Sequence, residues 1–320
     1  MVRRTTKLLI RFFFSSISKL KQPIEGSVLK IGIVTRNRNS WSSTQLREAL
    51  SRRSIPYICF SFPLLTARVA YAPKLSVGNV NLLENLDALI IRPIGRGSLE
   101  EIVFRMDMLY KLERNGMYIV NPPEAIEHCV DKYDILAILE EKGIPVPRTA
   151  VTENVEQAIR AFHELGEDVI IKPLFGSRGI GSTRIRDAEV ASTIFRALNF
   201  HHNVLYIQEF VQHGFSDIRA LVVGNSVIAA MRRVANSWKT NYSQGARPEP
   251  VKLESPLEEL AIKSAGLIGC KIAGVDILEG KNGPLVVDVN SQPGWRGLQS
   301  VTNFNIADKI VDFILSDIIR

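Results

Sequence analysis

A segment near the carboxyl end constrains this chain most, because it reads as a strand hairpin with charged residues inside otherwise apolar strands. Residues 274–294 read GVDILEGKNGPLVVDVNSQPG. The glycines and the asparagine of residues 280–283 predict a tight turn, since these residue types supply the positive φ that short hairpins need. We therefore expect one strand at 275–278 and a second strand at 285–289, paired across the turn.

Three polar side chains of this hairpin are candidate metal ligands. Asp288 and Asn290 are two residues apart and point the same way, and strand pairing allows Asp276 to face them. Two carboxylates and one amide oxygen suit Mg²⁺, a hard cation that prefers oxygen ligands and shares them with phosphates. The alternative is that these are ordinary polar residues at strand ends. Against it, an uncompensated carboxylate inside an apolar strand costs several kcal/mol, and a bound metal is one direct compensation.

The first third of the chain alternates strands with helices. Apolar runs predict strands at 28–35, 55–60, 87–92 and 117–120, and helices at 41–53 and 98–114, the second opened by a Ser98–Glu101 capping box. This alternation predicts an open α/β domain, and the lack of G-x-G-x-x-G after the first strand disfavours a dinucleotide site. Loops after two of these strands place charged and polar side chains where such folds bind ligands. The alternative, that these side chains are only solvated by water, is held equally open. These side chains are Arg36, Asn37, Arg92 and Arg96.

The rest of the chain reads as a second, mixed region. A helix is expected at 131–142, and prolines in 144–149 predict an extended linker. A strand at 169–173 carries a lysine and leads into a glycine-rich hairpin, 174–182, whose backbone N–H groups can lie over phosphate oxygens. Further elements are expected as a strand at 204–211, a hairpin at 217–233 turning at Gly224-Asn225, and helices at 255–269 and 306–319.

Composition excludes several classes of protein. The chain has 320 residues, 46% of them hydrophobic, and a net charge of +7 whose excess lies in the basic residues 1–22. No apolar run reaches the roughly 18 residues that a membrane span needs. Three cysteines without C-x-x-C spacing indicate a reducing compartment, which predicts the cytoplasm. Residues 1–27 read as a basic extension, either a tail or a surface for a membrane or partner subunit. DNA binding is not expected, because aromatic residues are not interleaved with the basic ones.

Several motifs in fixed order resemble the RimK-like glutamate ligases of the ATP-grasp superfamily. They are D-K at 131–132, I-K-P with its glycine hairpin at 171–182, Q-E-F-V at 208–211, D-I-R at 217–219, G-V-D at 274–276 and D-V-N-S-Q-P-G at 288–294. Members of this family usually carry Glu where this chain has Asp288. The resemblance covers about residues 88–318. It implies an α/β fold with an N-terminal α/β (pre-ATP-grasp) domain at 28–125, a central lid domain at 126–206 and a C-terminal domain at 207–320, with ATP between the last two.

The resemblance also implies residue roles. Arg219 and Arg232 are the expected catalytic residues, with Arg233 as the alternative to Arg232. Asp276, Asp288 and Asn290 are expected to hold Mg²⁺ or Mn²⁺, as two ions. The expected ATP contacts are Lys132, Lys172, Gly176, Ser177, Gly179, Ile180, Gly181, Gln208, Glu209, Phe210, Val211, Asp217, Lys239 and Asn241.

The implied chemistry is ligation of L-glutamate to a carboxylate-bearing acceptor through an acyl phosphate. R-P-I-G-R-G-S-L-E-E at 92–101 and N-P-P-E-A-I-E at 121–127 resemble most the tetrahydromethanopterin:α-L-glutamate ligases, which implies a pterin acceptor. Acceptors of other branches are a ribosomal protein, a deazaflavin cofactor or an amino-acid carrier protein. Another ATP-grasp ligase, a non-catalytic nucleotide-binding module and a homo-oligomer remain open alternatives.

Overall fold

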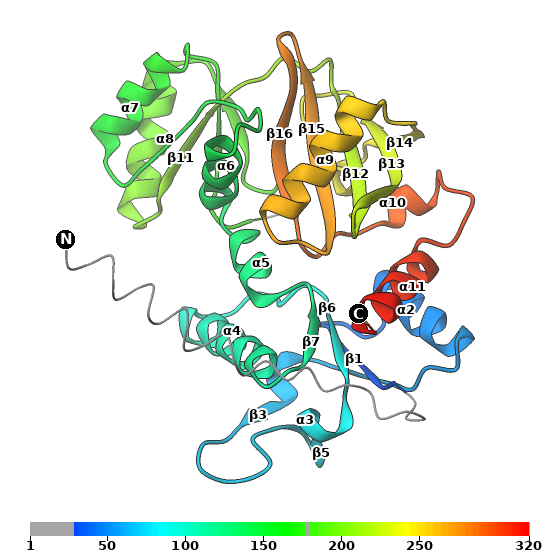
Figure 1. Ribbon diagram of the computed structural model, residues 1–320. Coiled ribbons are helices and arrows are strands. Elements are labelled where there is room, and N and C mark those ends of the chain that lie inside the picture. Colours follow the sequence, from blue (N-terminus) through cyan, green and yellow to red (C-terminus); the bar gives the residue numbers. More distant parts are fainter. Residues whose placement is uncertain (1–28, 177–178, 320) are drawn as a thin grey trace, which may run out of the picture. The chain divides into compact units, whose positions relative to one another are not determined.

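The structure, a computed structural model, describes residues 29–176 and 179–319 (Figure 1). These residues form two compact units. Unit 1 comprises residues 29–123 and 311–319, and unit 2 comprises residues 124–310. The domain boundaries expected at 125 and 206 stay predictions. Along the described ranges, no helix combines the length and the apolar character that crossing a bilayer requires.

Unit 1 is built on a parallel four-stranded sheet in the order β2-β1-β6-β7. The α/β expectation is therefore confirmed, although the strands are shorter than the apolar runs. The strands are β1 (Ile31–Val34), β2 (Tyr57–Phe60), β6 (Ala88–Ile91) and β7 (Tyr118–Val120), with helices α2 (Trp41–Arg52) and α4 (Leu99–Arg114). Ser98 and Glu101 make the expected capping box. Every residue of β1 and β6 is buried, as parallel strands covered on both faces require.

Unit 1 also contains a small antiparallel sheet that the sequence analysis missed. It comprises β3 (Leu65–Ala67), β4 (Leu75–Val77) and β5 (Val80–Asn81), flanked by η1 (Phe62–Leu64) and α3 (Leu82–Asn85). Its strands have two or three residues, too few for a period of two to be recognised. The end of α11 (Ile306–Ile318) belongs to unit 1, where the Tyr118 hydroxyl donates to Asp317 at 2.5 Å.

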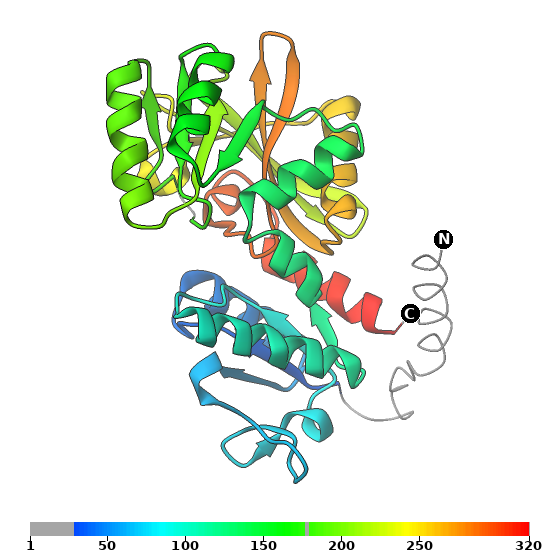
Figure 2. The ribbon, with the colours of Figure 1, turned by 90° about the vertical axis from the view of Figure 1, so that its left-hand side faces the viewer.

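Unit 2 begins with two helices and an antiparallel sheet in the order β10-β9-β11-β8. The helices are α5 (Pro123–His128) and α6 (Lys132–Glu141), and the strands are β8 (Thr149–Thr152), β9 (Val169–Lys172), β10 (Thr183–Ile185) and β11 (Leu205–Glu209). Two further helices, α7 (Val155–Glu164) and α8 (Ala188–Phe200), lie side by side on this sheet (Figure 2). Phe162 and Phe195 anchor them in a core with β9 and β11. These helices were not expected, although their caps, Asn154 and Asp187, are typical helix starts.

The second sheet of unit 2 carries the hairpin that is expected to bind metal. It is antiparallel in the order β14-β13-β12-β15-β16. Its strands are β12 (Ser216–Val223), β13 (Ser226–Val234), β14 (Arg247–Pro250), β15 (Ile272–Gly280) and β16 (Gly283–Asn290), accompanied by η2 (Tyr242–Gln244), α9 (Ser255–Leu267) and α10 (Arg296–Gln299). Both expected hairpins are confirmed, and Gly283, at φ 115°, supplies the positive φ of the second turn.

One face of this sheet is apolar and packs against α9 and α6 (Figure 1). Ile218, Val275 and Val289 are fully buried there. Because side chains alternate along a strand, residues one position away point to the other face. The core therefore fixes which polar residues gather on the opposite side.

Candidate active site

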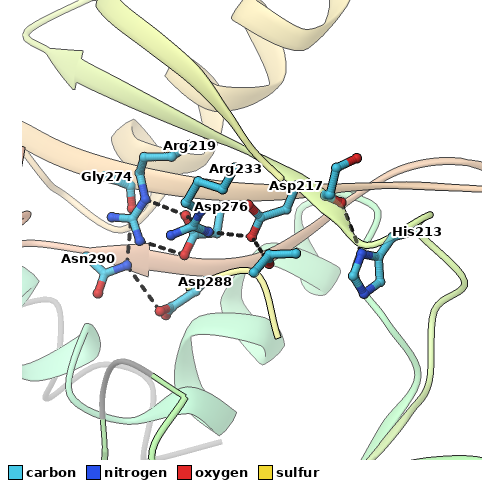
Figure 3. A network of polar contacts seen from close by, with 10 residues as sticks. His213, Asp217, Arg219, Arg233, Gly274, Asp276, Asp288 and Asn290 are labelled. Carbon is cyan, nitrogen blue, oxygen red and sulfur yellow. Dashed lines mark hydrogen bonds and ion pairs between the residues drawn. The ribbon is translucent and has the colours of Figure 1, made fainter. Parts of the chain in front are cut away.

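Charged side chains gather on the polar face of the second sheet of unit 2 (Figure 3). Arg219 on β12 lies opposite Asp276 on β15, and Asp217 lies opposite Arg233 on β13. Asp276 in turn lies opposite Asp288 on β16. Four adjacent strands thus contribute to one charged surface.

Two β-bulges set this arrangement. Between Gly280–Gly283 and Asp276 the pairing of β15 with β16 shifts by one residue, at Val287. Without that extra residue Asp276 would face Val287, and Asp288 would point to the apolar face. The pairing of β12 with β13 shifts similarly after Leu221, which places Arg233 rather than Arg232 opposite Asp217. Bulges of this kind re-aim side chains beside functional sites.

Arg233 holds the two buried carboxylates together. Its Nε donates to Asp217 Oδ1 at 2.6 Å, and a terminal nitrogen lies 2.9 Å from Asp276 Oδ1. Thr240 Oγ1 adds a hydrogen bond to Asp217 at 2.8 Å. Burial alone would lower the pKa of Arg233, but the charges of Asp276 and Asp217 raise it by more. The pKa of Arg233 therefore lies above its usual value. The guanidinium therefore stays charged and neutralises part of the acidic pair.

Arg219 completes the network on the other side of Asp276. A terminal nitrogen of Arg219 donates to Asp276 Oδ2 at 2.7 Å, and both side chains are largely buried. The backbone allows this close approach because residue 274 is glycine. A Cβ on Gly274 would lie 2.3 Å from an Arg219 nitrogen.

The expected metal ligands lie together at this surface. Asn290 Nδ2 donates to Asp288 Oδ2 at 3.1 Å and to Gly274 O at 3.4 Å. Burial raises the pKa of Asp288 and Asp276 raises it further, against the lowering effect of Arg219 and two lysines. The protein thus holds a carboxylate whose charged form lacks full compensation.

This donor set fits a divalent cation of the Mg²⁺ type. Among the residues described, no three His, Cys, Asp or Glu side chains gather to form a self-sufficient metal cluster. A metal here would take oxygens from Asp276, Asp288 and the Asn290 amide, whose O and N exchange places by a half-turn. Mg²⁺ usually accepts so few protein ligands and takes the others from water and phosphates.

A cavity of about 140 Å³ in unit 2 lies between this surface and the first sheet. Lys172, at the end of β9, donates to Gln208 Oε1 at 2.6 Å, and burial lowers its pKa to about 8. Lys132, at the start of α6, donates to the carbonyls of Leu174 and Gly176 at 2.9 and 2.8 Å. Two lysines therefore face two aspartates across one cavity.

Most of the other expected nucleotide contacts also line this cavity. They are Gly176, Gly179, Ile180, Gln208, Glu209, Val211, Asp217, Lys239 and Asn241. Gly179 packs on the 241–244 segment so closely that a Cβ would lie 2.2 Å from Asn241 Oδ1. Both carboxylate oxygens of Glu209 accept from Arg148, and the Glu209 backbone N–H donates to Arg148 O at 3.0 Å. Ser177 lies outside the described residues.

Five of the described expected residues do not line the cavity. Arg219 and Asn290 lie beside it and contact Asp276 and Asp288, and the other three lie further off. Gly181 packs on Pro173. Phe210 supports the site from behind, with the Arg184 guanidinium 3.2 Å above its ring. Arg232 points to the other face of the sheet, where it pairs with Glu279 and contacts Ser216 Oγ at 3.4 Å. The structure thus brings Arg233, not Arg232, to the cavity, because the bulge in the hairpin shifts the register by one residue.

Sequence reasoning missed His213, Trp238 and Thr240, which also line the cavity. His213 Nδ1 donates to Ser216 O at 3.0 Å, and the Trp238 ring lies edge-on to Phe210. Trp238 and Thr240 flank Lys239 in the irregular segment before β14. Their position next to Lys239, a predicted nucleotide contact, was the one feature of the sequence that could have identified them.

Comparison with known proteins identifies the family. The model of the RimK-like ATP-grasp domain matches residues 129–314. Two proteins named tetrahydromethanopterin:alpha-L-glutamate ligase are similar along the chain. The protein from Methanosarcina acetivorans is 33% identical and the one from Methanocaldococcus jannaschii 34%, covering 89% and 90% of this chain and 98% of each relative. A probable alpha-L-glutamate ligase from Hahella chejuensis is 31% identical over 91% of this chain and 97% of its own.

A solved structure shares the fold. The ATP-grasp ligase PsnB, complexed with minimal precursor, Mg and ADP, superposes with a TM-score of 0.70 at 21% identity, covering 91% of this chain and 98% of that one. The ATP-grasp fold expected from the motifs is therefore confirmed. Since the family model spans more than half of the chain and relatives above 30% identity match nearly from end to end, the protein belongs to the RimK-like ATP-grasp family of ATP-dependent ligases.

Proposed function

We propose that this ligase joins the amine of L-glutamate to a carboxylate of tetrahydromethanopterin with hydrolysis of ATP to ADP and phosphate. The names of the archaeal relatives support the acceptor and the amino acid. The cavity in which Lys132 and Lys172 face Asp276 and Asp288 supports the use of a nucleotide. That convergence of cations and carboxylates is the observation that carries the proposal.

The reaction needs activation, because a free carboxylate is a poor electrophile. An acceptor oxygen attacks the γ-phosphorus of ATP, which gives an acyl phosphate and releases ADP. The neutral amine of glutamate then attacks the acyl carbon, the C–O bond to phosphate breaks, and an amide forms. Phosphate carries away the bonding electrons, and one amine proton passes to phosphate or water.

The charged residues of the cavity have different roles in this reaction. Lys132 and Lys172 are placed to bind phosphate oxygens, and their charge offsets the negative charge that gathers as phosphoryl transfer proceeds. Arg233 and Arg219 orient Asp276, and Arg233 also fixes Asp217. Mg²⁺, with Mn²⁺ as a substitute, would be held by Asp276, Asp288 and Asn290 and would supply Lewis-acid charge to phosphate oxygens. The binding of two ions stays a prediction, as does the cytoplasmic location.

The test is an incubation of the whole protein with ATP, Mg²⁺, L-glutamate and tetrahydromethanopterin, read by mass spectrometry. We expect a product heavier by one glutamyl unit with the wild-type protein and none with Asp288→Asn. Glu279→Gln is the matched control, because Glu279 is a carboxylate of the same hairpin on the opposite face. It should retain product formation.

Other outcomes select among the alternatives. ADP release that depends on glutamate, but only with a different carboxylate acceptor, would retain the ligase and reject the pterin. Such acceptors include a ribosomal protein or a carrier protein, and the Hahella chejuensis relative is named without an acceptor. No ADP with any mixture, together with ATP binding that Mg²⁺ does not strengthen, would favour a non-catalytic nucleotide-binding module.

A further inference from the structure

Unit 1 carries an arginine cluster at the carboxyl edge of its parallel sheet. β1 and β6 are neighbours at the centre of this sheet, and the chain continues from β1 to one side and from β6 to the other (Figure 1). The boundary between them is the switch point of the topology, where open α/β sheets bind ligands. The loop after β1 holds Arg36 and Arg38, and the loop after β6 holds Arg92 and Arg96.

Packing brings the two loops together. Gly95, at φ 85°, lies against Arg36, because a Cβ there would be 3.5 Å from Arg36 Cδ. Arg105 of α4 reaches under the second loop, where one nitrogen donates to the carbonyls of Ile94 and Arg96 at 3.0 Å each. The buried Arg92 extends across to Ser42 Oγ at 3.3 Å, in the first turn of α2. The loops are therefore built parts of the fold.

The two loops themselves carry only positive charge, and Glu101, at the start of α4, pairs with Arg105 rather than with their arginines. Residues 35–40 and 92–98 contain four arginines and no Asp or Glu. Arg36, Arg38 and Arg96 are exposed, and within the described ranges none of the three makes an ion pair. Like charges held near one another repel, so the arrangement favours a bound anion. The N-terminus of the 12-residue helix α2 contributes its positive end to the same place.

We propose that this cluster, Arg36, Arg38, Arg92 and Arg96, binds a carboxylate or phosphate group of the acceptor other than the carboxylate that reacts. Guanidinium groups recognise both anions through paired N–H donors. The nucleotide has its own cations in unit 2, and four arginines exceed what the single net negative charge of L-glutamate needs. The cluster therefore suits an acceptor with several negative charges. The inference rests on the proposed function, since it requires a ligase with such an acceptor.

The test uses steady-state ligation by the whole protein, with each substrate varied in turn. Arg36→Ala and Arg96→Ala remove exposed side chains and leave the buried Arg92 in place. We expect each to raise the KM for the acceptor about tenfold, and the double variant to raise it further, with KM values for ATP and glutamate unchanged. Arg36→Lys should recover part of the loss. Arg114→Ala is the matched control, an exposed arginine at the far end of α4.

Each outcome decides the inference. Unchanged acceptor KM in the double variant would refute it while the ligase stands, and a raised KM for glutamate alone would assign the cluster to the other substrate. If the wild-type protein forms no product, the proposed function fails separately. Calorimetric titration with inorganic phosphate and with glutarate then tests the cluster itself. Binding by the wild-type that the double variant loses would support an anion site and show whether phosphate or carboxylate is preferred, and no binding of either would reject it.

Discussion

Removal of Arg233 should destabilise unit 2 strongly, whereas removal of its neighbour Arg232 should not. The Arg233 side chain is 5% exposed, and it compensates Asp217 and Asp276, which are 5% and 8% exposed. Breaking a buried pair by removing one partner leaves an uncompensated charge and costs about 3–5 kcal/mol. The Arg232 pair with Glu279 is 31% and 42% exposed, so its loss should cost about 0–1 kcal/mol.

The assay is urea unfolding of Arg233→Met and Arg232→Met, followed by tryptophan fluorescence in a Trp41→Phe background. The signal then comes from Trp238 and Trp295, both in unit 2. Adding Asp217→Asn to Arg233→Met should recover part of the loss, by about 0.5–3 kcal/mol, since the pair interacts directly. Equal destabilisation by the two arginine variants would refute the register that the bulge imposes, and with it the assignment of Arg233 to the cavity.

Two further predictions concern the site. Burial lowers the pKa of Lys172 to about 8, so the lysine loses its proton between pH 7 and pH 9. The affinity for ADP, titrated in EDTA, should therefore fall about tenfold over this range. The variant Lys172→Arg should abolish this pH dependence. A flat wild-type profile, or the same slope in Lys172→Arg, would contradict it. Gly274→Ala should lower kcat while leaving the KM for ATP nearly unchanged, because the added Cβ displaces the Arg219 guanidinium from Asp276. The control is Gly266→Ala on α9, where a Cβ would meet open space. Equal kinetics of the two variants would oppose the role of Arg219 in orienting Asp276.

The sequence predicts the elements better than their register. Long apolar runs and turn residues located the parallel strands and both hairpins of unit 2, because burial and positive φ impose strong local preferences. Counting outward from the turn at Gly224-Asn225 pairs Asp217 with Arg232. The extra residue of a bulge pairs Asp217 with Arg233 instead, and no sequence feature of residues 221–229 predicts this bulge. The choice between Arg232 and Arg233 therefore required the structure.

The same limit applies to the hairpin of residues 274–294, which is expected to bind metal. Counting outward from Gly280–Gly283 would pair Asp276 with Val287 and place Asp288 among the apolar residues that pack on α9. A one-residue slip moves every subsequent side chain to the other face, so the bulge decides whether the two carboxylates meet. The prediction that they share a face assumed that the strands pair across the turn and relied on the chemistry of oxygen ligands, without counting the register. One bulge lies next to Asp276, and the other lies between the Gly224-Asn225 turn and Arg233. Since a bulge gives up ladder hydrogen bonds, both are best explained by the charged surface that they create.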